Sequence, residues 1–446
     1  MSSLTELADT VAAGKFLTEP VAFGGRVKSL HSNSAVLEGM PSHLQLGDMV
    51  KLLHSGGSTR VEVVKISDES ALGIPCEPMG GISPGAAALI DQAVKKRNAQ
   101  EMLGRVVNAF GEPIDGESSI SLAPIQNDAP VDSSPMKRGR VEMPIKTGIR
   151  LVDIFTPICV GQRLGIFAGS GVGKSTLLAM FAKTDDFQAV VISLVGERSR
   201  EVREFVEDTL GPERLRKSII VVATSDESAV MRKRAPVTAM EIARDLARQG
   251  KRVLCLVDSL TRYAHALREV AVTLGEPPVS RGYPSSVFTE LPRLLEMAGP
   301  SETGSDGSVT LVATVLVDGD DHNDPVSDCL RGILDGHLVL DRGLANRGRL
   351  PAIDPAASIS RLATRVWSES ERGLVSKLKS MVTLFEESRD LRMMGGYQHG
   401  ADADLDQAVS LVPVIYEFLK QGIDDPVSGD VFADLAAHLK QETASE

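Results

Sequence analysis

The chain has 446 residues, which is too long for one ordinary domain and predicts two or three. Its apolar content is normal and it contains one tryptophan, a composition typical of a globular protein rather than a disordered or fibrous one. The formal net charge of −12 argues against a general binder of nucleic acid or of anionic membranes. The basic run 232–234 is either a local patch or a solvated helix face.

The cysteines and the apolar runs indicate the cellular compartment in which we expect the protein. Cys76, Cys159, Cys255 and Cys329 are widely spaced and form no Cys-x-x-Cys pair, which indicates buried thiols in a reducing compartment rather than disulfides or a zinc site. No apolar run approaches the length of a membrane span, and no signal peptide opens the chain. We therefore expect a cytoplasmic protein whose membrane association, if any, is peripheral.

The N-terminal part divides into a tail and a small β domain. Residues 1–21 form the tail, in which 2–18 are either a short amphipathic helix that binds a partner or a frayed terminus. Residues 22–97 carry short alternating apolar runs separated by turn residues, which predict a β-barrel or sandwich with a structural or assembly role. The runs expected to form strands are 25–30, 48–53, 60–64 and 71–74.

Residues 98–366 read as an α/β domain. After a strand and turn at 104–115 and an extended loop at 117–143, near-continuous apolar runs alternate with helical segments. Such runs are buried on both faces, as in a mostly parallel sheet covered by helices. The expected strands are 163–167, 189–194, 218–223, 252–257 and 309–317, and the expected helices are 176–183, 200–210 and 238–249. For the last helix, Thr238 and Glu241 have the spacing of a capping box, and Gly250 is a stop signal.

Residues 367–446 predict a helical C-terminal domain. Ser368 and Glu371 form a second capping box, which opens a helical stretch to about Met394. Amphipathic helices are expected at about 404–421 and 427–441.

A glycine-rich loop at 168–175 lies between the strand 163–167 and the helix 176–183. Its three glycines let several backbone N–H groups point toward one spot, and the N-terminus of the following helix adds further N–H groups there. Such an arrangement binds phosphate oxygens. Lys174 can reach the terminal phosphates and the Ser175 hydroxyl can ligate Mg²⁺. The alternative is an ordinary glycine-rich turn. The predicted nucleotide-binding residues are Ala168, Gly169, Ser170, Gly171, Val172, Gly173, Lys174, Ser175 and Thr176.

Three more residues fit parts of a phosphoryl-transfer site. Asp258 ends a strand and can hold Mg²⁺ directly or through water, or it is an ordinary turn residue. Glu197 follows the strand 189–194 and can polarise the attacking water, or it only favours the dipole of the next helix. Arg361 can deliver a fork of donors to a γ-phosphate in a neighbouring subunit, although the residues alone favour a surface arginine.

Four spaced motifs resemble the catalytic subunits of rotary ATPases. They are the stretches 171–175, 196–198, 256–262 and 351–360. Within that superfamily the chain looks like the flagellar and type III secretion export ATPases, because the stretches 276–288, 315–325, 334–342 and 396–406 agree with them.

This resemblance implies an N-terminal β-barrel, a central RecA-like P-loop domain and a C-terminal helical domain, assembled as a homohexamer. It implies ATP and Mg²⁺, with Lys174 and Ser175 on phosphate and metal, Glu197 activating water beside Arg198, Asp258 supporting the metal and Arg361 reaching a neighbour's nucleotide. The partners that it implies are a regulatory stator protein near the N-terminus, a central stalk protein, export chaperones with their substrates, and the membrane export gate.

One departure from the family pattern concerns the adenine. Relatives often carry a tyrosine that stacks on the base just before the segment 351–354, where this chain has Leu350. We therefore expect weaker adenine affinity or selectivity unless Tyr397 compensates.

The leading hypothesis is an ATPase that energises flagellar protein export, working at the inner membrane. The alternatives are a virulence type III secretion ATPase, a rotary ATP synthase subunit, a Rho-type RNA translocase and a non-catalytic assembly subunit. The acidic charge and the lack of a basic, aromatic-rich first domain disfavour RNA, and the presence of Glu197 disfavours the last of these.

Overall fold

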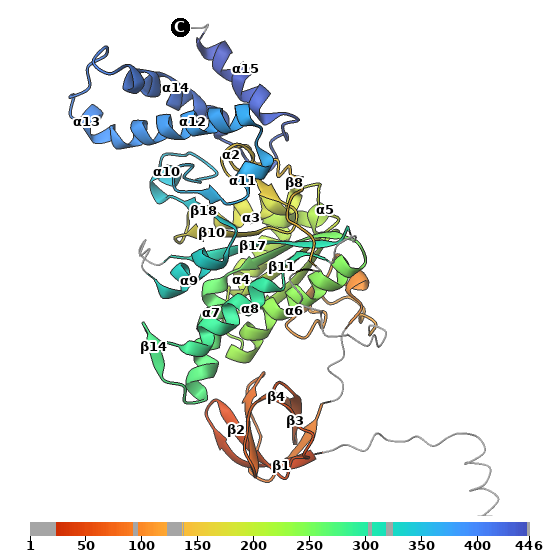
Figure 1. Ribbon diagram of the computed structural model, residues 1–446. Coiled ribbons are helices and arrows are strands. Elements are labelled where there is room, and N and C mark those ends of the chain that lie inside the picture. Colours follow the sequence, from red (N-terminus) through yellow and green to blue (C-terminus); the bar gives the residue numbers. More distant parts are fainter. Residues whose placement is uncertain are drawn as a thin grey trace, which may run out of the picture. The chain divides into compact units, whose positions relative to one another are not determined.

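The computed structural model describes residues 24–91, 97–122, 136, 138–301, 306–317 and 324–443. The predicted N-terminal tail lies outside these ranges, as do residues 123–135 of the predicted loop. The chain divides into two compact units, residues 1–94 and 95–446, coloured from red to blue along the sequence in Figure 1. The predicted division of the second unit between residues 366 and 367 stays a prediction.

The first unit is the predicted β-barrel. Six strands close in the order β1-β2-β5-β4-β3-β6, and each hydrogen-bonds antiparallel to its neighbours. Alternating apolar side chains such as Val27, Leu37, Val50 and Val61 fill its interior. The sequence missed β2 and β6. The strands are β1 Gly24–His31, β2 Ser34–Glu38, β3 Met49–His54, β4 Gly57–Ile66, β5 Ser70–Pro75 and β6 Ala87–Ile90.

The second unit is organised around a nine-stranded sheet. The path β19-β18-β10-β17-β13-β11-β12-β7 is parallel except at β19, and β16 adds an antiparallel pair to β17. All seven residues of β11 and six of the seven in β13 are buried, as the apolar runs predict. The strands are β7 Val106–Asn108, β10 Arg163–Ala168, β11 Ala189–Val195, β12 Ser218–Ala223, β13 Arg252–Asp258, β16 Gly299–Pro300, β17 Ser308–Leu316, β18 Gly336–Leu340 and β19 Ile359–Ser360.

Helices cover this sheet and short strand pairs flank it (Figure 1). The long helix α6 packs on β11, β12 and β13, and α7 packs on α6 and β17. The helices are η1 Ala99–Met102, α2 Arg150–Phe155, α3 Lys174–Lys183, α4 Ser199–Glu204, η2 Phe205–Leu210, α5 Gly211–Leu215, α6 Ala229–Arg248, α7 Leu260–Thr273, α8 Ser285–Glu296, α9 Pro325–Ile333, α10 Arg342–Asn346 and α11 Ala363–Val366. The short strands are β8 Pro144–Ile145, β9 Ile158–Cys159, β14 Pro278–Ser280 and β15 Tyr283–Pro284.

The predicted start of the helix at 238 is wrong. Helix α6 begins at Ala229, where the Ser228 hydroxyl accepts a hydrogen bond from the Met231 amide at 3.4 Å. Thr238 therefore lies in mid-helix, where its hydroxyl donates to the Ala109 carbonyl at 2.7 Å instead of capping. The stop signal is correct, because Gly250 follows the last turn with a φ of 83°.

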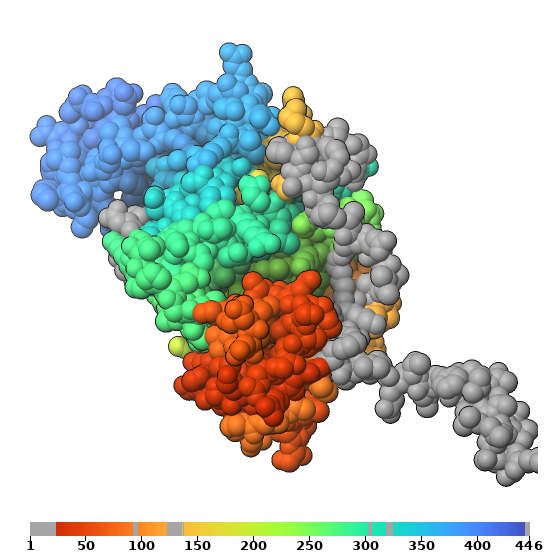
Figure 2. All heavy atoms as spheres, turned by 60° about the horizontal axis from the view of Figure 1, so that its bottom comes forward, coloured from red at the N-terminus to blue at the C-terminus, as the bar shows by residue number. Residues whose placement is uncertain are grey.

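The C-terminal part of this unit is helical, as predicted, and it consists of α12 Glu369–Glu387, α13 Arg389–Met393, α14 Ala403–Leu419 and α15 Val431–Thr443. The capping box of Ser368 and Glu371 is present at the start of α12. The predicted helical stretch to about Met394 consists of α12 and α13, which are divided at Ser388, whose hydroxyl donates to the Phe385 carbonyl. In Figure 2 the spheres of these helices (blue) are continuous with the sheet region before them (teal and green).

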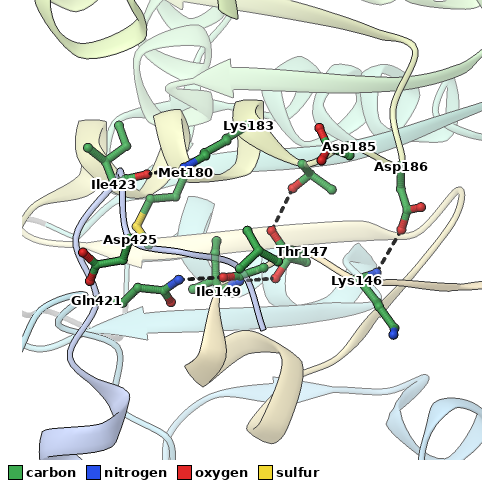
Figure 3. A pocket seen from close by; sticks show the side chains of 13 residues that line it. Lys146, Thr147, Ile149, Met180, Lys183, Asp185, Asp186, Gln421, Ile423 and Asp425 are labelled. Atoms are coloured by element: carbon green, nitrogen blue, oxygen red, sulfur yellow. Dashed lines mark hydrogen bonds between the residues drawn. The ribbon is translucent and has the colours of Figure 1, made fainter. Parts of the chain in front are cut away.

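A seam joins the segment after α14 to the C-terminal end of α3. Lys183 Nζ donates to the Ile423 carbonyl at 3.2 Å, and Gln421 Nε2 donates to the Gly148 carbonyl at 2.7 Å (Figure 3). A cavity of about 240 Å³ lies along the seam, and none of the predicted site residues lines it. The seam ties the last helices to the helix that starts at the phosphate-binding loop.

Two other expectations concern the cysteines and the membrane. All four cysteines are free thiols, and three of them are buried. Among the described residues, no helix is long and apolar enough to cross a membrane.

Candidate active site

The glycine-rich loop connects the strand β10, which ends at Ala168, to the helix α3, which starts at Lys174. Gly171 and Gly173 adopt φ values of 78° and 90°, in the left-handed region that glycine favours. Val172 is buried and anchors the loop, whereas Ser175 is exposed on the first turn of α3. The N-terminus of a ten-residue helix thus faces solvent, as an anion site requires.

Lys174 meets two carboxylates that come from separate strands of the sheet. Its Nζ lies 2.6 Å from Asp258 Oδ1 and 3.6 Å from Glu197 Oε1. The three side chains are only 14%, 5% and 15% exposed for Lys174, Asp258 and Glu197 respectively. The structure therefore brings together three of the residues that the sequence singled out, because the carboxyl ends of neighbouring parallel strands meet at one edge.

A buried hydroxyl that the sequence analysis missed supports Asp258. Thr314 Oγ1, on β17, donates to Asp258 Oδ1 at 2.7 Å, and Thr314 is fully buried. The available signal was a polar residue within the apolar run 309–317. The donors Lys174 and Thr314 both bind Oδ1, and among the described residues no donor binds the other carboxylate oxygen, which can therefore accept from a water or bind a cation.

Glu197 is held by its backbone and by a second cation. Its carbonyl accepts from the Ser225 amide at 2.9 Å, and Arg262 Nε lies 3.6 Å from its carboxylate. Burial raises the pKa of Glu197 and the Asp258 charge raises it further, while Lys174 and Arg262 oppose the shift. A carboxylate with a raised pKa beside a phosphate site is suited to accept a proton.

Glycine is required before Glu197. Gly196 has a φ of 68°, and a Cβ there would lie 2.7 Å from Cδ of Arg262. This close approach lets Arg262, another residue that the sequence analysis did not select, reach Glu197 from the helix α7.

Two more side chains lie against the loop. Arg342, at the start of α10, donates from Nη2 to the Ser170 carbonyl at 3.3 Å and was also missed. Leu350 is 48% exposed, and a Cβ on Gly173 would lie 4.0 Å from its Cδ2. Leu350 thus stands beside the loop, where the resemblance places the adenine contact.

The other predicted residues have different surroundings. Exposed Arg198 pairs with Glu201 at 3.4 Å, and the Tyr397 hydroxyl donates to Asp406 at 2.7 Å. Arg361 is exposed and donates from Nη2 to the Arg331 carbonyl at 3.0 Å. None of these contacts joins the cluster around Lys174, so a role for these three residues in nucleotide binding or turnover stays a prediction.

The oxygen atoms at this site suit a magnesium ion for which the protein supplies only some of the ligands. No group of three or more His, Cys, Asp or Glu side chains in the described part of the chain could hold a metal by itself. Mg²⁺ is usually bound by one or two protein oxygens, with substrate phosphates and water completing its shell. The Ser175 hydroxyl and the free oxygen of Asp258 fit that pattern.

The chain is similar to proteins of a known family. Residues 148–360 match the ATP synthase alpha/beta family, nucleotide-binding domain, and residues 367–441 match the T3SS EscN ATPase C-terminal domain. The chain is 52% identical over 444 residues to the flagellum-specific ATP synthase of Agrobacterium fabrum, covering 99% of this chain and 92% of the relative.

Solved structures of the assembled ATPase EscN from the enteropathogenic E. coli type III secretion system share the fold. One is 34% identical with a TM-score of 0.83 and covers 94% of this chain and 99% of EscN. The other, in complex with its central stalk EscO, is 33% identical with the same TM-score and the same coverage.

Proposed function

The chain is an ATPase of the family that contains the flagellum-specific ATP synthases and the type III secretion ATPases, and we propose that its hydrolysis of ATP energises flagellar protein export. The observation that carries the proposal is the contact of Lys174 with Glu197 and Asp258 beside the loop, in a chain so similar to flagellar relatives.

In the proposed reaction a water attacks the γ-phosphorus, and the bond from that phosphorus to the β–γ bridging oxygen breaks. The products are ADP and phosphate. Glu197 orients the water and takes its proton, which its raised pKa favours. On nucleotide binding, Lys174 exchanges part of its contact with Asp258 and Glu197 for the terminal phosphates.

We assign the magnesium ion to the Ser175 hydroxyl and the Asp258 carboxylate. When bound, the ion neutralises charge on the phosphates. Thr314 keeps the Asp258 carboxylate oriented through its hydrogen bond to Oδ1. Leu350 is the proposed adenine contact, whereas the Tyr397 hydroxyl is hydrogen-bonded to Asp406.

Arg361 is the proposed trans residue of a homohexamer. Among the described residues its guanidinium meets a backbone carbonyl and no carboxylate, so its remaining donors can serve a phosphate of a neighbouring copy. The assembled state of EscN supports this arrangement. An isolated chain should then hydrolyse ATP slowly.

The proposed setting is the cytoplasm, with peripheral association at the export apparatus of the inner membrane. A central stalk protein is a proposed partner because EscN is known with its stalk EscO. The stator protein, the export chaperones with their substrates, and the membrane export gate are further proposed partners. A virulence secretion role is the second candidate, because EscN belongs to such a system.

The decisive experiment deletes the gene and complements it with the wild type or with Glu197→Gln. We expect the deletion strain to lack flagella and to retain other secretion, and the wild type to restore flagellin in the culture medium. Glu197→Gln should bind ATP but lose nearly all turnover. Unchanged turnover would remove Glu197 as the base, and normal flagella in the deletion strain would exclude the flagellar role.

Purification tests the assembly. A ring that forms from this chain alone supports an export ATPase, whereas an obligatory second subunit type would favour a rotary ATP synthase. Turnover that does not respond to added RNA would dismiss an RNA translocase.

A further inference from the structure

An aromatic ring stands directly before the phosphate-binding loop. Phe167 is the residue of β10 that precedes Ala168, and it is buried. Its ring lies over Gly165, where a Cβ would be 2.8 Å from the ring atom Cε2. A side chain at position 165 would displace the ring, so Gly165 leaves the space that the ring occupies on the strand that carries the loop.

Two side chains flank this ring. The guanidinium carbon of Arg331, on α9, lies 4.7 Å from the ring centroid. His337, on the adjacent strand β18, meets the ring edge-on with centroids 5.6 Å apart. Burial and then the charge of Arg331 lower the pKa of His337, so the imidazole packs as a neutral group beside the cation.

The same arginine holds Arg361 through its backbone. The Arg331 carbonyl accepts from Arg361 Nη2 at 3.0 Å, while the Arg361 amide donates to the Asp335 carbonyl at 2.9 Å. Arg361 also directly follows β19, which pairs with β18. A continuous series of contacts therefore runs from the loop through Phe167 and Arg331 to the guanidinium of Arg361.

We propose that Phe167 and Arg331 are positioning residues that couple the nucleotide loop of one subunit to that subunit's own Arg361. The inference rests on the proposed function, in which Arg361 acts on the nucleotide of a neighbouring copy. A nucleotide that shifts the loop and β10 moves the ring, and Arg331 transmits the shift to the arginine that serves the next site. Occupancy of one site thereby regulates turnover at its neighbour, which makes the ring cooperative.

The test measures ATP turnover of the assembled full-length chain as a function of ATP concentration. Phe167→Leu removes the aromatic face, and Arg331→Met removes the cation while keeping the carbonyl. Each should lower kcat roughly tenfold with KM within about twofold, and should bring the Hill coefficient of a cooperative wild type close to one. Phe167→Tyr keeps the ring face and should retain both kcat and cooperativity. If Arg331 only filled volume, Arg331→Met would retain both as well.

Combination with Arg361→Ala separates this inference from the proposed function. If Phe167 acts through Arg361, Phe167→Leu should cause no further loss of kcat in the Arg361→Ala background. If the two losses of kcat multiply in the double variant, or if Arg331→Met leaves kcat and the Hill coefficient unchanged, the inference is overturned while Arg361 remains a trans residue. Normal turnover of Arg361→Ala itself would instead overturn the trans role. If Phe167→Leu fails to fold, the result for Arg331→Met decides alone, because Arg331 is partly exposed.

Discussion

The two regions assigned to ATP turnover are held in opposite ways. Lys174, Glu197 and Asp258 are nearly buried and form ion pairs within a single chain. Arg361 is exposed, and within the described part of the chain its side chain donates only to a neutral carbonyl. Charges that already have partners are preorganised and require no second molecule, whereas a guanidinium without a carboxylate can accept an anion from elsewhere. From this difference we propose that one half of the site is complete in the monomer and that the other half acts in an assembly.

The largest effect should come from the half that is complete within the chain. Lys174→Ala leaves two nearly buried carboxylates without their common cation and removes the phosphate contact, so turnover should fall by about 10⁴-fold together with ATP affinity. Steady-state hydrolysis and nucleotide titration measure both. Lys183→Ala, in the same helix but bonded to Ile423 at the seam, is the matched control and should retain turnover. Retained activity in Lys174→Ala would show that the loop does not bind the substrate.

The exposed half should respond only in the assembly. Arg361→Ala should lower turnover of the ring by about 10³-fold, with ATP affinity unchanged, because the arginine acts on the transition state in a neighbour. The slow rate of the isolated chain should not change. If the isolated chain loses activity by the same factor, Arg361 acts within its own chain and the contrast between the two halves disappears.

The pH dependence sharpens the contrast, because only the buried half contains a carboxylate with a raised pKa. Glu197 must be ionised to accept a proton, so turnover should fall on the acid side at a pH above the ordinary value of 4.5. Arg262→Gln removes a charge that lowers this pKa, and the acid limb should move to higher pH. Lys377→Gln makes the same charge change at an exposed position of α12 and should leave the profile in place. An acid limb that moves equally in both variants would refute the assignment.

The buried hydroxyl behind Asp258 should have a smaller effect. Thr314→Val keeps the volume but leaves a charged acceptor short of one donor, so the free energy of unfolding should fall by about 2 kcal/mol. Thr314→Ser keeps the hydroxyl and should lose less. Denaturant unfolding of the two variants provides the comparison, and a larger loss in Thr314→Ser than in Thr314→Val would show that volume matters rather than the hydrogen bond.

The smallest expected effect concerns the adenine. Leu350→Tyr adds a ring beside the loop, and stacking should raise ATP affinity by about fivefold. Competition between ATP and a triphosphate that lacks the base measures the gain. A gain that is equal for both ligands would show that position 350 does not contact the adenine.

Local signals predicted most of the fold. The buried strands, the glycine-rich loop, the capping box at Ser368 and the stop at Gly250 each depend on a few consecutive residues, so a single sequence suffices to find them. The start of α6 was misplaced because Thr238 and Glu241 have the spacing of a capping box in mid-helix. There Thr238 bonds to Ala109, a residue 129 positions away.

The sequence by itself determined the chemistry of the loop and the class of the fold, because motif spacing and apolar periodicity are properties of adjacent residues. Only the tertiary structure decided which distant residues meet: Thr314 with Asp258, Arg262 with Glu197, and Arg331 with both Phe167 and Arg361. These contacts arise from the order of strands in the parallel sheet and from the helices packed on it. That order depends on burying all the apolar runs at once, and no short stretch of the chain encodes it.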